Sequence, residues 1–117
     1  MPWLWASVRS NPHNIDAWTT AIFVATDAMK NRVLARRILD EARAKNPQSI
    51  ELAYTEAHFI YDGGKGDLAA AKAAFVSARD MALRLCDGNP ENLSETDRWH
   101  YRFVLNFLRE LERPSVK

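Results

Sequence analysis

The chain has 117 residues, of which 47% are hydrophobic, and its 16 Lys and Arg against 15 Asp and Glu give a net charge of +1. This size and balance fit a single globular domain and argue against a polybasic nucleic-acid module or an acidic tail. The single cysteine, Cys86, excludes an internal disulfide framework and a zinc site built on paired cysteines.

The N-terminal segment 1–9 contains Trp3 and Trp5 but has no basic region, and its apolar stretch ends at Arg9. It is therefore not expected to act as a signal peptide. No part of the chain reaches the roughly 18 apolar residues that a membrane span needs, so an intracellular location is expected. For the two tryptophans three interpretations stay open: a segment folded back on the first helix, the remnant of a preceding helix, or a contact with another subunit.

Two Asn-Pro pairs mark helix starts, because Asn caps a helix and Pro at its first position gives up no needed donor. Asn11-Pro12 predicts a first helix over about 12–28, and Asn46-Pro47 predicts a third over about 47–61. The second helix is expected over about 32–45.

Further boundary signals follow in chain order. A turn at 30–31 precedes the second helix, and the glycine-rich stretch 62–66 ends the third. Asp67 is expected to cap a long fourth helix that ends near Cys86. The glycine-rich stretch lacks the spacing and the following Ser or Thr of a phosphate-binding loop, so a tight turn is the preferred interpretation.

The fifth helix is predicted from about Ser94, which opens a sequence similar to a capping box, to about 112, with Pro114 closing it. The fourth helix carries the clearest apolar stripe, with spacings of three and four. Its members are Leu68, Ala71, Phe75, Ala78, Ala82 and Leu85. No apolar alternation at period two occurs, so the predicted fold class is all-α.

Sliding the sequence by 36 positions superimposes aromatic, small and apolar residues on one another. The matches include Trp18 on Tyr54, Ala21 on Ala57, Phe23 on Phe59, Ala35 on Ala71 and Ala42 on Ala78. A period in the mid-thirties with two helices per unit predicts an antiparallel helix-hairpin repeat array of about five helices. We expect one domain over 1–117, with repeat one at about 11–45, repeat two at about 46–88 and a C-terminal helix at about 94–112.

Three segments resemble the tetratricopeptide (TPR) class, and they are most similar to its half-a-tetratricopeptide (HAT) relatives. They are Ala35-Arg36-Arg37-Ile38-Leu39-Asp40-Glu41-Ala42 followed by Pro47 and Leu52-Ala53-Tyr54; Gly66 to Phe75; and Arg98-Trp99-His100-Tyr101 with Phe107-Leu108. The resemblance covers about residues 11–112. It implies a scaffold of antiparallel helix pairs without catalytic activity, and in the HAT branch a place in a nuclear RNA-processing complex. Without that branch a cytoplasmic location is expected.

The fifth helix has more apolar surface than one packing stripe needs, and as a last element it lacks the polar outer face of a terminal cap. Trp99, Phe103, Phe107 and Leu111 are therefore candidate partner-binding residues. The partner is expected to be another protein or a second copy of the chain. Because about three repeats are usually needed for a stable array, the chain is expected to be a subunit or fragment of a larger complex.

Phe23 and Phe59 occupy equivalent positions of the two repeats. One interpretation places them in a groove that binds a partner's helix or extended segment. The alternative, which the sequence favours, is that both are core residues of the repeat.

A second function class is RNA binding through Arg32, Arg36 and Arg37 on the basic second helix. A solvated, salt-bridged helix face is the commoner explanation of such a pattern. The three histidines show no metal-binding spacing, and no catalytic constellation is found. No enzyme activity, metal, cofactor, membrane contact or small-molecule substrate is expected.

Overall fold

The computed structural model describes residues 13–112, in which every regular element is a helix or helical turn and no strand occurs. The predicted all-α class is therefore confirmed. The chain divides after Leu52 into two compact units, and the division lies inside helix α4 (Ile50–Tyr61). The predictions made for Trp3, Trp5, the Asn11-Pro12 pair and Pro114 lie outside the described residues.

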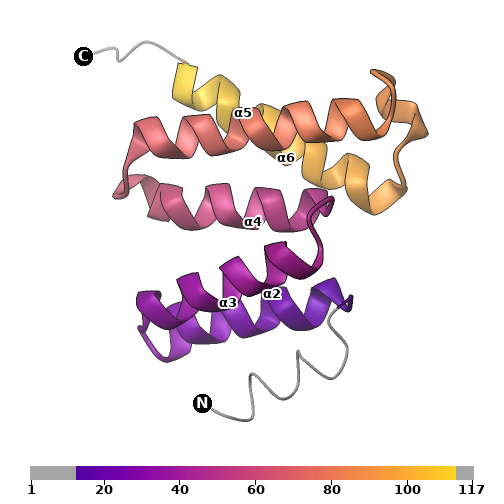
Figure 1. Cartoon of the computed structure of the whole chain (residues 1–117). Helices are drawn as coiled ribbons and strands as arrows, with labels where there is room; N and C mark the ends of the chain where they lie inside the picture. The colour runs from indigo at the N-terminus through magenta and orange to yellow at the C-terminus, as the bar shows by residue number, and fades with distance from the viewer. Residues whose placement is uncertain (1–12, 113–117) are drawn as a thin grey trace. The chain divides into compact units, whose positions relative to one another are not determined.

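The first unit contains α2 (Ile15–Phe23) and α3 (Arg32–Lys45), which pack side by side (Figure 1). α2 begins three residues later than expected from the sequence. The side chain of Asn14 caps it by accepting a hydrogen bond from the backbone N–H of Ala17 at 3.3 Å. α3 has the predicted bounds.

α2 does not end at Phe23 but continues as a π-helical turn, η1 (Val24–Ala28). The wider turn is closed by the Met29 N–H, which donates to the carbonyl of Val24 at 3.0 Å. The hydroxyl of Thr26 donates to the Ile22 carbonyl at 2.8 Å. Lys30 then adopts a positive φ of 53°, so the chain reverses into α3 as the 30–31 turn predicted.

The core of the first unit is built from one face of α2 and one face of α3. Trp18 has no exposed surface and is the largest residue in this core. The other buried residues of α2, η1 and α3 are Ala21, Ile22, Ala25, Ala35, Ile38, Leu39 and Ala42. The four alanines among them permit a close approach of the helices, and Trp18, Ile22, Ile38 and Leu39 are the large buried side chains between them.

The predicted start of α4 at Asn46-Pro47 is wrong. Asn46 instead caps the end of α3, where its backbone and side-chain amides both donate to the carbonyl of Ala42. Since that side chain is engaged, the hydroxyl of Ser49 takes the capping position and accepts from the Leu52 N–H at 3.1 Å. α4 therefore begins at Ile50.

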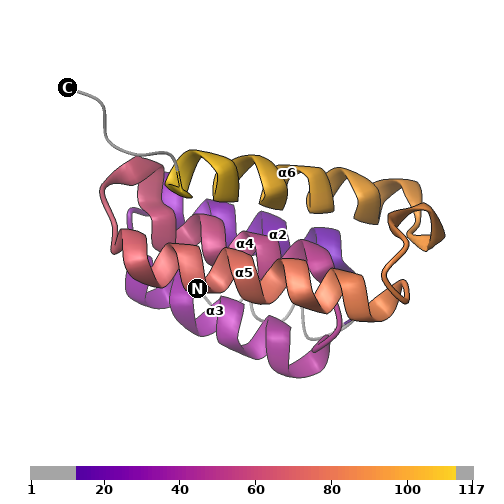
Figure 2. The ribbon, with the colours of Figure 1, turned by 90° about the horizontal axis from the view of Figure 1, so that it is seen from above.

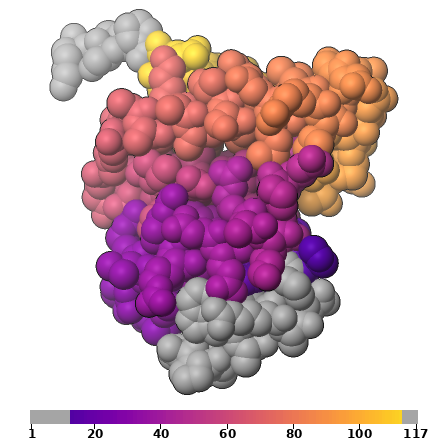
Figure 3. All heavy atoms as spheres, in the orientation of Figure 1, coloured from indigo at the N-terminus to yellow at the C-terminus, as the bar shows by residue number. Residues whose placement is uncertain are grey.

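The second unit contains the rest of α4, the 3₁₀ turn η2 (Asp62–Gly64), α5 (Leu68–Leu85), a second 3₁₀ turn η3 (Pro90–Asn92) and α6 (Glu95–Glu112). Asp67 caps α5 and Ser94 caps α6, as predicted; each accepts a backbone N–H three residues on. α5 and α6 lie side by side in Figures 1 and 2 and pack against one another. In the view of Figure 3, α5 forms much of the visible surface of this unit.

The apolar stripe of α5 is correct only in its middle. Ala71, Phe75, Ala78 and Ala82 are fully buried, whereas Leu68 and Leu85 are 46% and 43% exposed. Both leucines are terminal residues of the helix and adjoin exposed loops, so the spacing that predicts a common face does not predict burial at its ends. Met81 adds a buried side chain that the stripe did not include.

The turn between α4 and α5 depends on glycine at one position above all. A Cβ placed on Gly66 would collide with the backbone carbonyl oxygen of Ile60, whereas a Cβ on Gly63 would meet nothing within 4 Å. The N–H of Gly66 also donates to the Tyr61 carbonyl at 3.1 Å. The glycine-rich breaker predicted from the sequence is therefore also a site of close backbone approach.

We expect Gly66→Ala to lower the free energy of unfolding by about 2 kcal/mol or more, because the backbone must shift to admit the methyl group. Gly63→Ala is the matched control, and its positive φ of 64° alone should cost about 1 kcal/mol. Urea unfolding followed by circular dichroism measures both. Equal losses for the two variants would contradict the close approach at Gly66.

Candidate interaction surface on the C-terminal helix

Tyr54 on α4 is the centre of an aromatic cluster in the second unit. Its ring lies 5.7–6.2 Å from five other rings, measured between centroids. These rings belong to His58, Phe75, His100, Phe103 and Phe107. The cluster joins α4, α5 and α6, so it fixes the position of α6 within the unit.

Burial raises the pKa of the Tyr54 phenol above its ordinary value of 10.0 by removing the group from solvent. The folded unit therefore holds this proton more tightly than the unfolded chain does. The stability linked to Tyr54 is present below pH 10 and decreases as the pH rises above it.

We expect the free energy of unfolding to fall less above pH 10 in Tyr54→Phe than in the natural chain, because the variant has no phenol to ionise. Urea unfolding at pH values below and above 10 measures the difference. Two parallel pH dependences would show that the Tyr54 phenol titrates equally in the folded and unfolded chains.

The four candidate residues of α6 do not share one environment. The ring of Phe107 stacks on Phe75 with a centroid distance of 4.8 Å and an interplanar angle of 8°, so it belongs to the packing of the unit. Leu111 is partly buried. Trp99 is 52% exposed and Phe103 37% exposed, and their rings meet edge to face at 5.8 Å.

Trp99 and Phe103 thus remain as an exposed aromatic pair one turn apart on α6. We call their surface, with the exposed residues Glu95 and Arg102 beside them, the α6 outer face. Phe103 has its inner side against Tyr54 and His100. The pair is consequently held by the aromatic cluster while part of each ring stays in solvent.

Of the charged residues near the aromatic pair, one forms an ion pair with another described residue and two do not. Arg98 donates to the carboxylate of Glu91 at 3.2 Å. Glu95 and Arg102 form no ion pair with any residue between 13 and 112. One acidic and one basic side chain without a partner among these residues therefore lie one helical turn before and one turn after Trp99.

Phe23 and Phe59 lie in different units. Phe23 is 51% exposed at the end of α2, so its interpretation as a core residue is wrong. Phe59 is partly buried on α4. Their role in partner binding stays a prediction.

The basic residues of α3 agree in part with a salt-bridged surface. Arg36 pairs with Asp40 one turn further on, at 3.1 Å. Arg32 and Arg37 are exposed. α3 (Arg32–Lys45) contains no aromatic residue on which a base could stack. RNA binding through these three residues stays a prediction.

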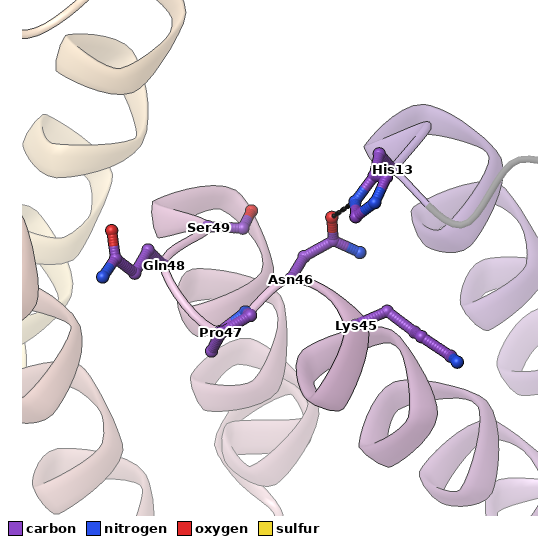
Figure 4. A pocket seen from close by; sticks show the side chains of 6 residues that line it. All are labelled: His13, Lys45, Asn46, Pro47, Gln48 and Ser49. Carbon is purple, nitrogen blue, oxygen red and sulfur yellow. Dashed lines mark hydrogen bonds between the residues drawn. The ribbon is translucent and has the colours of Figure 1, made fainter.

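A shallow hollow of about 410 Å³ lies in the first unit, where the α3–α4 connection passes the start of α2. Its lining includes His13 and Asn46, whose Nδ1 and Oδ1 atoms are 3.1 Å apart (Figure 4). The side chains of Lys45 and Gln48 extend in different directions from this pair. No set of donors therefore converges on one point of the hollow.

The described residues were also searched for a metal site, a reactive cysteine and a membrane span. No three His, Cys, Asp or Glu residues gather there as metal ligands would. Cys86 is buried at the end of α5, and its thiol lies 3.7 Å from the Leu83 carbonyl. Residues 13–112 also include no helix with the length and apolar character that a membrane span requires.

Comparison of the chain with protein-family models, curated proteins and solved structures finds no match. The α6 outer face is thus identified from its own geometry: an exposed tryptophan and phenylalanine, anchored from behind by a ring cluster and flanked by charges of opposite sign. Such a surface can bury aromatic area against another protein.

Proposed function

We propose that this chain is a non-catalytic protein–protein interaction scaffold that binds its partner through the α6 outer face. The observation that carries the proposal is the exposure of Trp99 beside Phe103 in a unit where the rings of Tyr54, Tyr61, Phe75 and Phe107 pack on one another. Tryptophan is among the residues that contribute most to binding energy at interfaces, and its burial removes a large apolar area from water.

The resemblance to TPR and HAT repeats supports the same role. Within the first unit α2 packs against α3, as a hairpin of repeat one would. Within the second unit the closely packed pair is α5 with α6, which crosses the predicted boundary between repeat two and the C-terminal helix, so only the first pair supports the resemblance. A scaffold of such hairpins in a nuclear RNA-processing complex is the proposed setting. The exposed partner-binding pair revises the predicted set, because Phe107 serves the packing of the unit.

The anchoring of the pair also supports binding. Tyr54 contacts Phe103 at 5.8 Å, and Phe103 contacts Trp99 at the same centroid distance. Because one ring of the pair is fixed against the cluster, the indole has fewer orientations to lose when a partner covers it. Such preorganisation lowers the entropic cost of association.

The test compares association of the whole chain with that of Trp99→Ser, measured by light scattering and by affinity capture on the immobilised protein. We expect the variant to weaken association about thirtyfold, the loss typical of a tryptophan at the centre of an interface. Its far-ultraviolet circular dichroism and melting temperature should stay close to those of the natural chain, since half of the indole is already exposed.

The matched control is Leu85→Ser, which removes another exposed apolar side chain of the second unit, 43% exposed at the end of α5. Association should survive this change. A chain that neither self-associates nor captures a protein through Trp99 would overturn the proposed function.

A further inference from the structure

The order of residues on the α6 outer face is self-complementary. Glu95 lies one turn before Trp99, and Arg102 lies one turn after it, so the acidic and basic side chains bracket the indole. Seven residues separate Glu95 from Arg102, which is two turns and places them on the same side of the helix. Both are exposed and lack an ion-pair partner among the described residues.

An antiparallel second copy of the helix meets this pattern. A two-fold axis perpendicular to α6, midway between Glu95 and Arg102, places each glutamate opposite the arginine of the other copy, about 5 Å from the axis along the helix. The same axis passes beside Trp99, so the two indoles meet at the centre. The apolar contact and both ion pairs are then formed by one operation.

From this arrangement we infer that the partner bound by the α6 outer face is a second copy of the chain, with the two α6 helices antiparallel and centred near Trp99. The inference rests on the proposed function, because it names the partner of the same surface. Arg98, whose guanidinium is bonded to Glu91 of its own chain, is not required for the pairing.

The charge of the face favours a copy over a partner of strong charge. It presents one free acidic and one free basic side chain beside the indole, and the whole chain has a net charge of +1. A strongly acidic or basic partner would leave one of the two side chains facing a like charge, which opposes association. A second copy of α6 places an opposite charge against each of the two side chains.

The experiment is sedimentation analysis of the whole chain over a wide range of concentrations, with Glu95→Arg, Arg102→Glu and the double exchange. We expect a reversible dimer with a dissociation constant in the micromolar range or weaker, because a contact between single helix faces is small. Each single reversal should weaken the dimer about tenfold or more, and the double exchange should restore it to within about threefold of the natural chain.

The matched control is Glu112→Arg, the same reversal on α6 but outside the outer face, and it should leave the dimer unchanged within about threefold. A dimer that neither reversal weakens, or that the double exchange fails to restore, overturns the antiparallel pairing. If the chain is a monomer at all concentrations but still captures another protein through Trp99, the inference that the partner is a second copy is wrong and the proposed function stands. A monomer without such capture overturns both.

Discussion

Phe107→Glu is expected to unfold the second unit rather than to block a partner. The phenylalanine ring stacks on Phe75 at 4.8 Å and contacts Tyr54 and Tyr61 at 6.1 and 5.2 Å. A glutamate removes these ring contacts and places a carboxylate against apolar rings. We expect a loss of about 3 kcal/mol or more in the free energy of unfolding, a large part of the stability of a small domain.

Thermal and urea unfolding, followed by circular dichroism, measure this loss. Trp99→Ser is the control on the same helix, and its unfolding free energy should change by less than about 1 kcal/mol, since the indole is half exposed. A Phe107→Glu chain that melts like the natural one while losing its association would return Phe107 to the interface.

The sequence predicts Trp99, Phe103 and Phe107 as one group of partner-binding residues, although their environments in the structure differ. Trp99, Phe103 and Phe107 follow one another at intervals of four residues, and each interval rotates the side chain by about 40° around the helix. The row therefore drifts from solvent toward the core, with exposure falling from Trp99 to Phe103 and Phe107 stacked inside. Apolar spacing identifies the row, but the drift becomes visible only when the packing direction of α6 is known.

Helix bounds were predictable where a boundary has a single dominant local signal. Asn31 and Asp67 each cap the helix that follows, and the glycine at position 66 ends the turn before α5. At Asn46-Pro47 the local signal fails, because the asparagine side chain bonds to Ala42 and to His13 instead of capping α4. Competition between capping positions is settled by contacts that a sequence does not show.

The superposition of the two repeats also predicted some equivalent positions correctly and others not. It matches Trp18 with Tyr54, and both occupy central positions of their units: Trp18 is fully buried and Tyr54 contacts five rings. It matches Phe23 with Phe59 as well, yet Phe23 is half exposed where α2 widens into the π-helical turn. Equivalent positions in the superposition therefore do not guarantee equivalent burial.

In the first unit, the largest single loss of stability is expected from Trp18→Ala. The indole has no exposed surface, and half of the other buried residues on α2 and α3 are small: Ala21, Ala35 and Ala42. Alanines cannot move inward to fill the space, so the cavity stays open. We expect a loss of about 3–5 kcal/mol in the free energy of unfolding, the range for removing a buried tryptophan.

Trp18→Phe separates the volume of the side chain from its apolar character, because it keeps an aromatic ring while removing part of the volume. We expect it to lose about 1–3 kcal/mol, clearly less than Trp18→Ala. Val33→Ala, at a site 73% exposed on α3, should change the free energy of unfolding by less than about 0.5 kcal/mol. If Trp18→Ala were as mild as Val33→Ala, the buried indole could not be the element that holds α2 against α3.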